Sequence, residues 1–327
     1  MAKKIILAIS VFLLSLVLIF IAGPKTTIEL STEVAELPDD LDFYLHQSES
    51  HLNLVSDDIQ KRIRWANFSK KQKTQLSIIY LHGYTATSRE THPLTEEIAE
   101  KIGANVYYAR LSGHGQPKEE FAEATVKEWS EDTLEAWEIG KRIGEKVIII
   151  GTSTGATLAS WLAITEDMTS LAALVFISPN FGLANKTAPV LLLPWGVQLA
   201  ELITGGPYYV WEPSNKDQGK YWQTSPSHKT TAQLAKLVAY LDQQDLSIIK
   251  SPVLTLYSDF DDTVSVPKIK EKFKTLGAEK KRLVAVDSRP NPSKHVLAGN
   301  IVGFNTTNEV KEAILDFLAT EVGVTDI

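Results

Sequence analysis

Short apolar runs recur along the chain after residue 75, and each is long enough for a strand but too short for a helix. Polar or turn-forming residues flank most of these runs. Four to eight apolar residues in such a setting are typical of strands that are buried on both faces of a sheet. The predicted strands are Ile78–Leu81, Asn105–Ala109, Val147–Ile150, Ala173–Ile177, Val253–Tyr257 and Arg282–Val286.

Longer segments, in which apolar residues recur every three or four positions, lie between or after the apolar runs. This spacing places the apolar side chains on one face of a helix. Strands that alternate with helices indicate an α/β fold with a mostly parallel central sheet and helices on both faces. The predicted helices are Pro93–Lys101, Val126–Glu145, Gly155–Glu166, Thr230–Asp242, Pro267–Leu276 and Asn308–Leu318.

The first apolar segment is of a different kind. Ile5–Gly23 contains no charged residue and follows Lys3 and Lys4. About 20 apolar residues span a bilayer as a helix, whereas the core of a signal peptide is usually shorter. We therefore predict a retained anchor, with a cleaved signal as the alternative. Because lysines precede the segment and acids such as Glu29 and Glu33 follow it, we expect the rest of the chain on the extracytoplasmic side, periplasmic or extracellular.

One long interval, residues 181–229, interrupts the alternation of strands and helices with prolines, glycines and aromatic residues. An interval of this length inside an α/β domain usually has a function or structure of its own, and we expect a cap over the carboxyl edge of the sheet. The predicted organisation is an anchor or signal at 1–24, a linker with an irregular or antiparallel portion at 25–75, a core at 76–180, the cap at 181–229 and the rest of the core at 230–327.

The stretch KVIIIGTSTGATLA raises the first question of chemistry, because two glycines bracket a single serine between a strand and a helix. Gly151 and Gly155 stand two positions before and after Ser153, in the pattern G-x-S-x-G. At such a sharp strand-to-helix turn the serine hydroxyl is exposed, and side chains at the glycine positions would clash. We therefore expect Ser153 to be a nucleophile; the alternative is an ordinary loop with a serine cap.

A serine hydroxyl needs a base to take its proton, and in this architecture the acid and the histidine follow the serine in the chain. Of the seven histidines, His228 and His295 follow Ser153. His228 precedes every suitable acid and falls in the predicted cap. His295 lies in a polar loop after the last predicted strand, and we expect it to be the base.

The acid that orients the histidine should follow the strand before the last one. The segment YSDFDDTV supplies three candidates there, Asp259, Asp261 and Asp262. We favour Asp261, with Asp262 in reserve, because the apolar residues that follow would anchor the loop and turn one acid inward.

A tetrahedral intermediate also needs hydrogen-bond donors for its oxyanion. One donor is the backbone N–H of the residue after the nucleophile, Thr154, and the other comes from the loop after an earlier strand. Gly83 and Tyr84 follow the strand at Ile78–Leu81 directly, so we expect the Tyr84 N–H to be the second donor. His82 is interpreted as a structural residue beneath this loop.

The composition of the chain excludes several classes of function. The net charge of −7 and the absence of a basic stripe argue against nucleic acid as a partner. With no cysteine, disulfides, thiolate catalysis and cysteine-bound zinc are excluded. Motifs of the H-E-x-x-H and G-x-x-x-x-G-K types are lacking, and we expect no cofactor and no metal.

Five segments together, YLHGYTAT, RLSGHG, IIIGTSTGA, YSDFDDTV and NPSKHVLAG, resemble serine hydrolases of the α/β-hydrolase fold. The likeness is to the group of monoacylglycerol lipases, carboxylesterases and serine aminopeptidase-like hydrolases. It implies an α/β-hydrolase fold with a cap inserted after the sixth strand. The implied roles are Ser153 as nucleophile, Asp261 as acid, His295 as base, and Tyr84 with Thr154 as the oxyanion hole.

The function expected from these residues is hydrolysis of a carboxylic ester, either lipid-like or small, through an acyl-enzyme on Ser153. Two alternatives use the same residues, a serine aminopeptidase or amidase and an acyltransferase. A non-catalytic binding protein of the same fold is a third. The expected partners are a small acyl ester and the membrane, with the oligomeric state left open.

Overall fold

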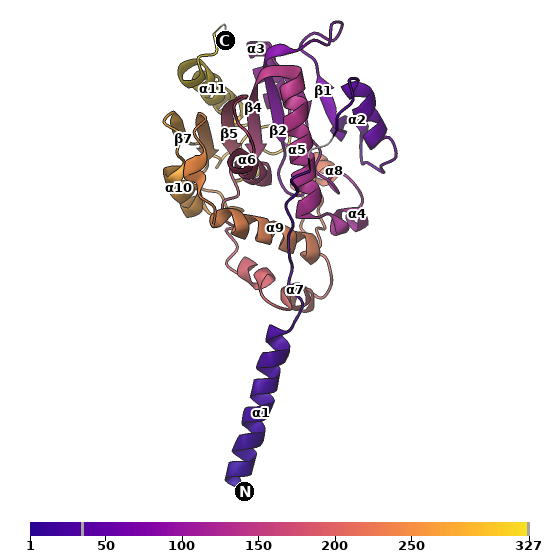
Figure 1. The fold of residues 1–327 in the computed structure, drawn as a ribbon, viewed down its shortest axis with the longest axis vertical. Helices are drawn as coiled ribbons and strands as arrows, with labels where there is room; N and C mark the ends of the chain where they lie inside the picture. The colour runs from indigo at the N-terminus through magenta and orange to yellow at the C-terminus, as the bar shows by residue number, and fades with distance from the viewer. Residues whose placement is uncertain (34–35, 326–327) are drawn as a thin grey trace.

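The computed structural model describes residues 1–33 and 36–325, so residues 34–35 of the expected linker and 326–327 of the expected core lie outside it. It has a body built around one sheet and a single helix that projects from it (Figure 1). The strands are β1 (Arg62–Arg64), β2 (Thr74–Leu81), β3 (Asn105–Tyr108), β4 (Gly144–Thr152), β5 (Leu171–Ile177), β6 (Val253–Tyr257) and β7 (Lys281–Ala285).

The helices are α1 (Ala2–Ile21), α2 (Leu41–Glu49), α3 (Leu94–Ile102), α4 (Lys118–Glu123), α5 (Val126–Ile143), α6 (Thr154–Thr165), α7 (Gly196–Thr204), α8 (Lys216–Tyr221), α9 (His228–Asp242), α10 (Val266–Thr275) and α11 (Thr307–Phe317). Short helical turns lie at η1 (Asp57–Ile59), η2 (Ala188–Leu192), η3 (Leu246–Ile248) and η4 (Leu318–Val322). The six predicted helices correspond to α3, α5, α6, α9, α10 and α11, with ends shifted by at most two residues.

The sheet has seven strands in the order β1-β3-β2-β4-β5-β6-β7. β1 pairs antiparallel with β3, and all the other pairs are parallel. The predicted mostly parallel α/β fold is therefore confirmed. The cap segment follows the fifth strand of this chain, β5, and not a sixth strand as the resemblance implied. The count is lower by one because the described residues before Arg62 form no strand.

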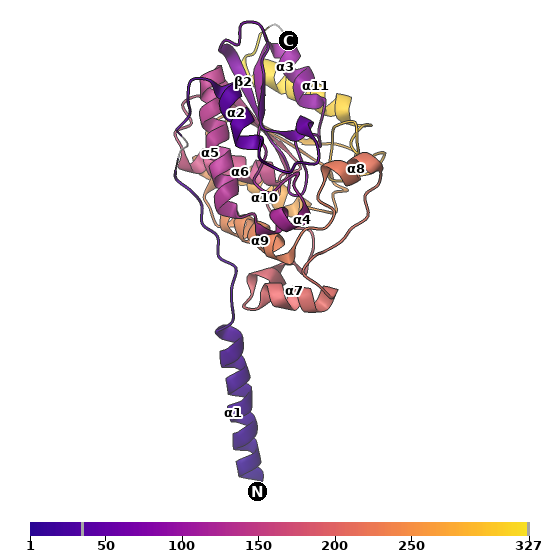
Figure 2. The same ribbon diagram turned by 90° about the vertical axis from the view of Figure 1, so that its right-hand side faces the viewer.

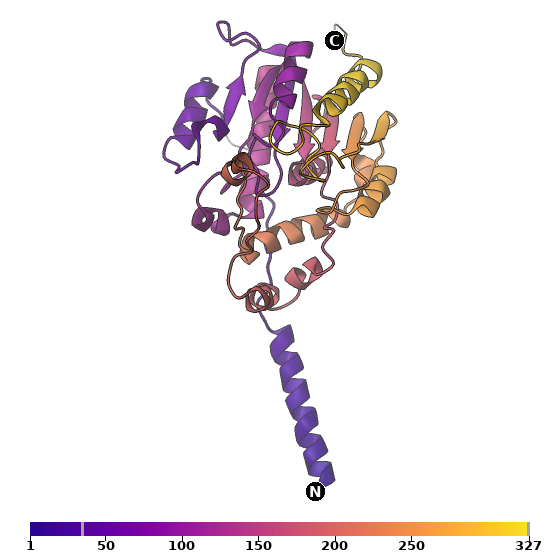
Figure 3. The same cartoon turned by 180° about the vertical axis from the view of Figure 1, so that it is seen from behind.

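The two faces of the sheet are buried under different helices. Alternate residues of one strand point to opposite faces, so Ile79 and Leu81 pack with α5 and α6, whereas Ile78 and Tyr80 pack with α3 and α11. The view from behind shows α3 and α11 over the second face (Figure 3). This double coverage explains why the strands read as uninterrupted apolar runs.

α1 extends away from the body, and α7 lies at the end of the body nearest to it in both perpendicular views (Figures 1 and 2). Lys3–Ile21 has a mean hydropathy of 2.9 and is not buried by the rest of the protein, so it is long and apolar enough to cross a membrane. Near an N-terminus, such a helix is either a membrane anchor or a signal sequence.

Candidate active site

The turn between β4 and α6 holds Ser153 in an unusual backbone conformation. Its φ is 53° and its ψ is −112°, values that a residue with a side chain seldom adopts. The Ser153 N–H donates to the Ile177 carbonyl oxygen at 2.9 Å, and the Ser153 carbonyl oxygen accepts from the Asn180 N–H at 3.1 Å. These bonds to the end of β5 and to the segment after it hold the strained turn in place.

The two glycines of the turn are required by close backbone contacts. A Cβ on Gly155 would overlap the carbonyl oxygen of Leu81, at the end of β2. A Cβ on Gly151 would lie 2.7 Å from the backbone nitrogen of Ala156, so the backbone would have to shift to make room for it. The helix α6 can therefore start directly against the strands, with Ser153 at its N-terminal end.

His295 and Asp261 meet at the same edge of the sheet. The Nδ1 atom of His295 lies 2.7 Å from Oδ2 of Asp261, whose side chain is fully buried. The other Asp261 oxygen, Oδ1, accepts the N–H groups of Thr263 and Val264 at 2.9 and 3.0 Å. Both oxygens of Asp261 are thus held by hydrogen bonds. Because Asp261 binds the Nδ1 atom of His295, the Nε2 atom of the ring remains available to accept or donate a proton.

The other two aspartates of this loop have different contacts. Asp259 is exposed and pairs with Lys270 at 2.7 Å. Asp262 is exposed beside the cavity described below, and its Oδ1 accepts the Thr263 hydroxyl at 3.4 Å. Among the three candidates from the sequence, Asp261 is the one that contacts His295.

The charges around His295 favour its protonated form. Burial by itself would lower the pKa of this imidazole, but the Asp261 carboxylate, with further contributions from Glu90 and Asp262, raises the pKa above its usual value. An imidazolium that forms during a reaction would therefore be stabilised here.

Ser153 and His295 face one cavity of about 430 Å³ at the carboxyl edge of the sheet. Ser153 is 6% exposed, and no hydrogen bond joins its hydroxyl to another of the described residues. Ligands of open α/β sheets bind at this edge, where side chains from the strand ends converge. The apolar and aromatic part of the cavity lining consists of Leu183, Tyr209, Trp211, Trp222, Pro226, Leu234 and Val296.

The two predicted oxyanion donors border the same cavity. Tyr84 follows Gly83 in the loop after β2, and both line the cavity with Ser153. Neither the Tyr84 N–H nor the Thr154 N–H donates to an acceptor within residues 1–33 and 36–325. The Tyr84 ring is turned away into the body, where its hydroxyl donates to Thr230 Oγ1 at 3.0 Å.

The sequence reading overlooked Glu90, a buried carboxyl group that lines the cavity. Its Oε1 accepts the Gly83 N–H at 2.7 Å and the Tyr80 hydroxyl at 2.9 Å. The Tyr80 hydroxyl in turn lies 3.1 Å from the hydroxyl of Thr152, the residue before Ser153. Burial raises the pKa of Glu90 to about 7. This chain of hydrogen bonds connects the loop after β2 with the turn that carries Ser153.

Two other histidines support the site from beneath. His82 Nε2 accepts the Leu111 N–H at 3.0 Å, and burial lowers the pKa of His82 to about 4. Its ring packs edge-on against His114 of the RLSGHG segment, with centroids 4.8 Å apart. His82 is thus neutral and structural, as the sequence suggested, and His114 packs behind Tyr84 rather than lining the cavity.

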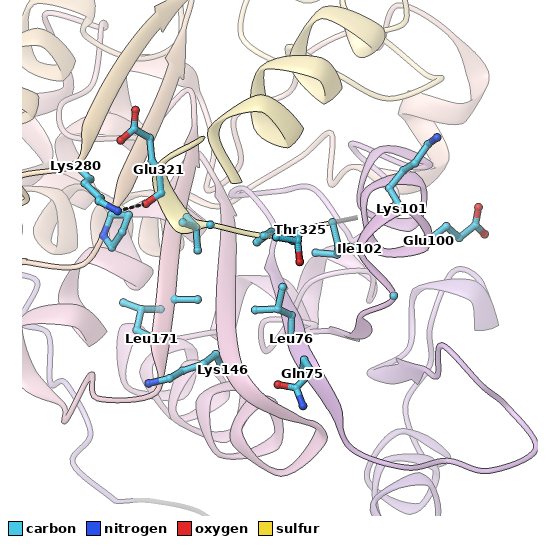
Figure 4. A pocket seen from close by; sticks show the side chains of 16 residues that line it. Gln75, Leu76, Glu100, Lys101, Ile102, Lys146, Leu171, Lys280, Glu321 and Thr325 are labelled. Carbon is cyan, nitrogen blue, oxygen red and sulfur yellow. Dashed lines mark hydrogen bonds between the residues drawn. The ribbon is translucent and has the colours of Figure 1, made fainter. Parts of the chain in front are cut away.

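A larger cavity of about 860 Å³ lies at the opposite, amino edge of the strands (Figure 4). Figure 4 shows its lining side chains spread over α3, β2, β4 and the C-terminal segment, with Lys280 donating to the Glu321 carbonyl oxygen. It has neither a histidine nor a serine in its lining. Chemistry, not size, therefore identifies the cavity at Ser153 as the candidate active site.

Comparison with known proteins places this chain in a family. Residues 72–288 match the family model described as serine aminopeptidase, S33. The thermostable monoacylglycerol lipase of Bacillus sp. (strain H-257) is 32% identical over 88 residues, which are 27% of this chain and 35% of that protein. The match thus spans about a third of that relative's length.

Solved structures show the fold at lower sequence identity. A structure from a study of LipS and LipT, two metagenome-derived lipolytic enzymes, has a TM-score of 0.60 at 18% identity, covering 75% of this chain and 94% of that one. The monoacylglycerol lipase of Paleococcus ferrophilus has a TM-score of 0.58 at 17% identity, covering 79% and 99%. These likenesses confirm the α/β-hydrolase fold.

Proposed function

The chain belongs to the serine aminopeptidase, S33, family of α/β-hydrolases, and we propose that it is a membrane-anchored serine hydrolase that cleaves carboxylic esters. The observation that carries the proposal is the buried pairing of His295 with Asp261 at 2.7 Å, in the cavity onto which Ser153 opens. A base oriented in this way is what a serine hydroxyl needs in order to attack a carbonyl group.

In the proposed reaction, Ser153 Oγ attacks the carbonyl carbon of the ester while His295 Nε2 takes the hydroxyl proton. The carbonyl oxygen becomes an oxyanion, which the N–H groups of Tyr84 and Thr154 stabilise. The bond to the leaving alcohol then breaks, and the alcohol takes the proton from His295. Water attacks the acyl-enzyme with His295 again as base, releasing the acid and restoring Ser153.

Asp261 keeps the Nδ1–H of His295 in place and stabilises the imidazolium. Glu90 is a positioning residue, because its bond to the Gly83 N–H holds the His82–Gly83 peptide unit, which is followed by the peptide unit that carries the Tyr84 N–H. An ester substrate is favoured by the apolar and aromatic cap side of the cavity, which suits an acyl chain. The lipase names of the relatives point to the same substrate class.

Peptide or amide cleavage is the second candidate, because two carboxyl groups, Glu90 and Asp262, line the cavity and could bind an ammonium group. Glu90 suits this role poorly, since its raised pKa leaves it largely neutral below about pH 7 and Oε1 already accepts two hydrogen bonds. Glu201 and Glu212, two carboxyl groups of the cap, do not line the cavity.

We further propose that α1 is retained as an anchor and that the body lies on the extracytoplasmic side. Lys3 and Lys4 at the start of α1 favour a cytoplasmic N-terminus, because positive residues are retained on that side.

The test is a substrate panel on the detergent-solubilised full chain. Esters of one alcohol with acyl chains from acetyl to oleoyl are compared with aminoacyl amides. We expect kcat/KM for medium or long acyl esters to exceed that for every amide by at least about 100-fold. An amide that is cleaved faster than every ester would replace the ester proposal with the peptidase one.

A further inference from the structure

The end of the cap that faces α1 exposes an unusual amount of apolar surface. Leu202 and Ile203 on α7 are 79% and 77% exposed, and neighbouring apolar side chains are exposed with them. Residues 187–211 contain one charged residue, Glu201. The exposed members of this apolar end are Leu193, Trp195, Leu202, Ile203, Tyr209 and Val210. A surface of this composition facing water is rare in soluble proteins and marks an interaction site.

The same end of the cap contacts the last turn of α1. The Trp195 indole N–H donates to the Ile19 carbonyl oxygen at 3.2 Å, which is one of the carbonyls that the end of a helix leaves without an internal partner. The Trp195 backbone N–H donates to the Pro24 carbonyl oxygen at 2.8 Å. Trp195 thus joins the cap to the point where the apolar helix ends.

The local backbone is arranged around this contact. A Cβ on Gly23 would overlap the indole ring, so the ring lies directly on the glycine. Trp195 itself has a φ of 62°, a conformation that a bulky residue adopts only when its surroundings hold it there. Tryptophan is favoured at the boundary between lipid and water because its ring is apolar and its N–H is polar.

These observations place the apolar end of the cap beside the C-terminal end of α1. If α1 spans the bilayer, its C-terminal end at Ile21 lies at the membrane surface, and Trp195 lies there with it. α7 lies at this end of the body in all three views (Figures 1, 2 and 3). A bilayer that surrounded α1 would therefore contact the apolar end of the cap.

The apolar end is also continuous with the active-site cavity. Tyr209, which is about half exposed on the cap, lines the cavity together with Trp211. The short segment between α7 and Trp211 thus runs from the apolar end of the cap to the cavity wall.

We propose that the apolar end of the cap is inserted in the membrane interface beside α1, and that the enzyme takes its substrate from the bilayer as an amphiphilic acyl ester. This rests on the proposed ester hydrolysis and on the anchoring role of α1. It specifies a membrane-resident substrate, which neither of those two proposals requires.

The location is tested with fluorescence on the full chain in phosphatidylcholine vesicles. Because the chain has no cysteine, Leu202→Cys and Ile203→Cys each give one labelling site for an environment-sensitive dye. The matched control is Phe68→Cys, 76% exposed in the β1–β2 loop at the far end of the body (Figure 1). We expect lipid-attached quenchers to quench the dye at 202 and 203 at least about threefold more than at 68.

Other results would overturn the proposal. If iodide in the water quenches the dyes at 202 and 203 as strongly as the dye at 68, the surface is exposed to water and is not inserted in the bilayer. Dyes that neither quencher reaches would show that a protein, such as a second copy of the chain, covers it. Neither result depends on catalysis, so the fluorescence separates this proposal from the proposed ester hydrolysis.

The consequence for substrate uptake is tested with the double variant Leu202→Asp, Ile203→Asp. Since both side chains are exposed and outside the cavity, hydrolysis of a soluble acetyl ester should stay within about twofold of the parent. Hydrolysis of a long-chain ester dissolved in vesicles should fall about tenfold, because two apolar side chains leave the interface. If the variant hydrolyses both substrates at the rate of the parent, uptake through this surface is excluded. If the variant loses activity on both substrates, the cause is a folding defect, which circular dichroism must then show.

Discussion

The proposed catalytic edge of the sheet and the cap of this protein are built on different principles. At the proposed catalytic edge, Ser153, Asp261 and His295 follow β4, β6 and β7, and hydrogen bonds donated by backbone N–H groups hold the turns at Ser153 and Asp261. In the cap, residues 181–227 form short helices and turns. One isolated bridge, Leu183 with Val264, joins the cap to the loop after β6, and a second, Tyr208 with Ser227, lies within the cap.

The difference suggests a division of work. In the proposed reaction the sheet edge is decisive, because a small displacement of a strand end would separate the proposed base, His295, from the proposed nucleophile, Ser153. The cap supplies Tyr209, Trp211 and Trp222 to the cavity and leaves other apolar side chains exposed toward α1. Changes at the edge should therefore affect every substrate alike, whereas changes in the cap should affect substrates selectively.

The strongest expected effect comes from Ser153→Ala, which removes the proposed nucleophile. We expect kcat to fall by about 10⁴- to 10⁶-fold on every substrate. The melting temperature should change little, because the Ser153 side chain caps no helix N–H. The control is Ser160→Ala on the same helix, where the hydroxyl bonds only the Ala156 carbonyl oxygen; its kcat should match the parent. Substantial turnover by Ser153→Ala would contradict the proposal that Ser153 is the nucleophile.

The second effect separates the neighbouring acids of one loop. Asp261→Asn should lower kcat by about 10³- to 10⁴-fold, because the amide no longer holds His295 in the correct tautomer. Asp262→Asn should cost less than about fivefold, since Asp262 does not contact the imidazole. Steady-state kinetics on one soluble ester measures both, and a larger loss for Asp262→Asn would reverse the assignment.

A smaller effect tests whether Glu90 positions the oxyanion loop. Glu90→Ala should lower kcat by about 10- to 100-fold with little change in KM, because the Gly83 N–H loses its acceptor. Glu90→Gln keeps an acceptor oxygen and should restore most of kcat. Equal losses in both variants would mean that the charge of Glu90, rather than its hydrogen bonds, is what matters.

The pH dependence of the reaction sharpens the role of His295. Asp261 raises the pKa of His295 above its usual value of about 6.5, and only the neutral imidazole can act as base. We therefore expect kcat/KM to fall by about tenfold for each pH unit below this raised pKa. A pH–rate profile on a soluble ester measures this decline. A rate that stays constant down to pH 4 would contradict a histidine base.

The smallest effect concerns stability. Between about pH 4.5 and 7 the unfolded chain releases the Glu90 proton while the folded protein retains it, so the parent loses stability as pH rises through this range. Relative to Glu90→Gln, the loss in the free energy of unfolding should reach at most about 3 kcal/mol. Melting curves of both proteins at pH 5 and pH 8 test this, and a difference that is independent of pH would contradict it.

Much of the edge could be predicted because its elements are long and locally specified. The apolar run before Gly151 and the close approaches at Gly151 and Gly155 follow from the sequence itself. The choice among the three aspartates could only be a preference. It depends on the turn in which Asp261 Oδ1 accepts the Thr263 and Val264 N–H groups, and a one-residue shift would present Asp262 instead.

The sequence predicted a cap at residues 181–229, but the helices within it and the contacts of Glu90 could not be predicted, for physical reasons. α7 and α8 are short and bordered by proline and glycine, so their apolar spacing does not reveal them. Glu90 stands among polar loop residues, and its importance arises only when the loop folds back so that its carboxylate meets Gly83 and Tyr80. A charged residue that becomes buried through tertiary contacts leaves no periodic signal.

The central claim is that one hydroxyl at the catalytic edge is activated for attack. Incubating the full chain with a fluorophosphonate and mapping the adduct by mass spectrometry tests it directly, with Ser153→Ala as the negative control. The account predicts one adduct per chain, on the peptide that contains Ser153, and strongly slowed labelling in His295→Ala. Folded protein that stays unlabelled, or that carries the adduct on another serine, would contradict it.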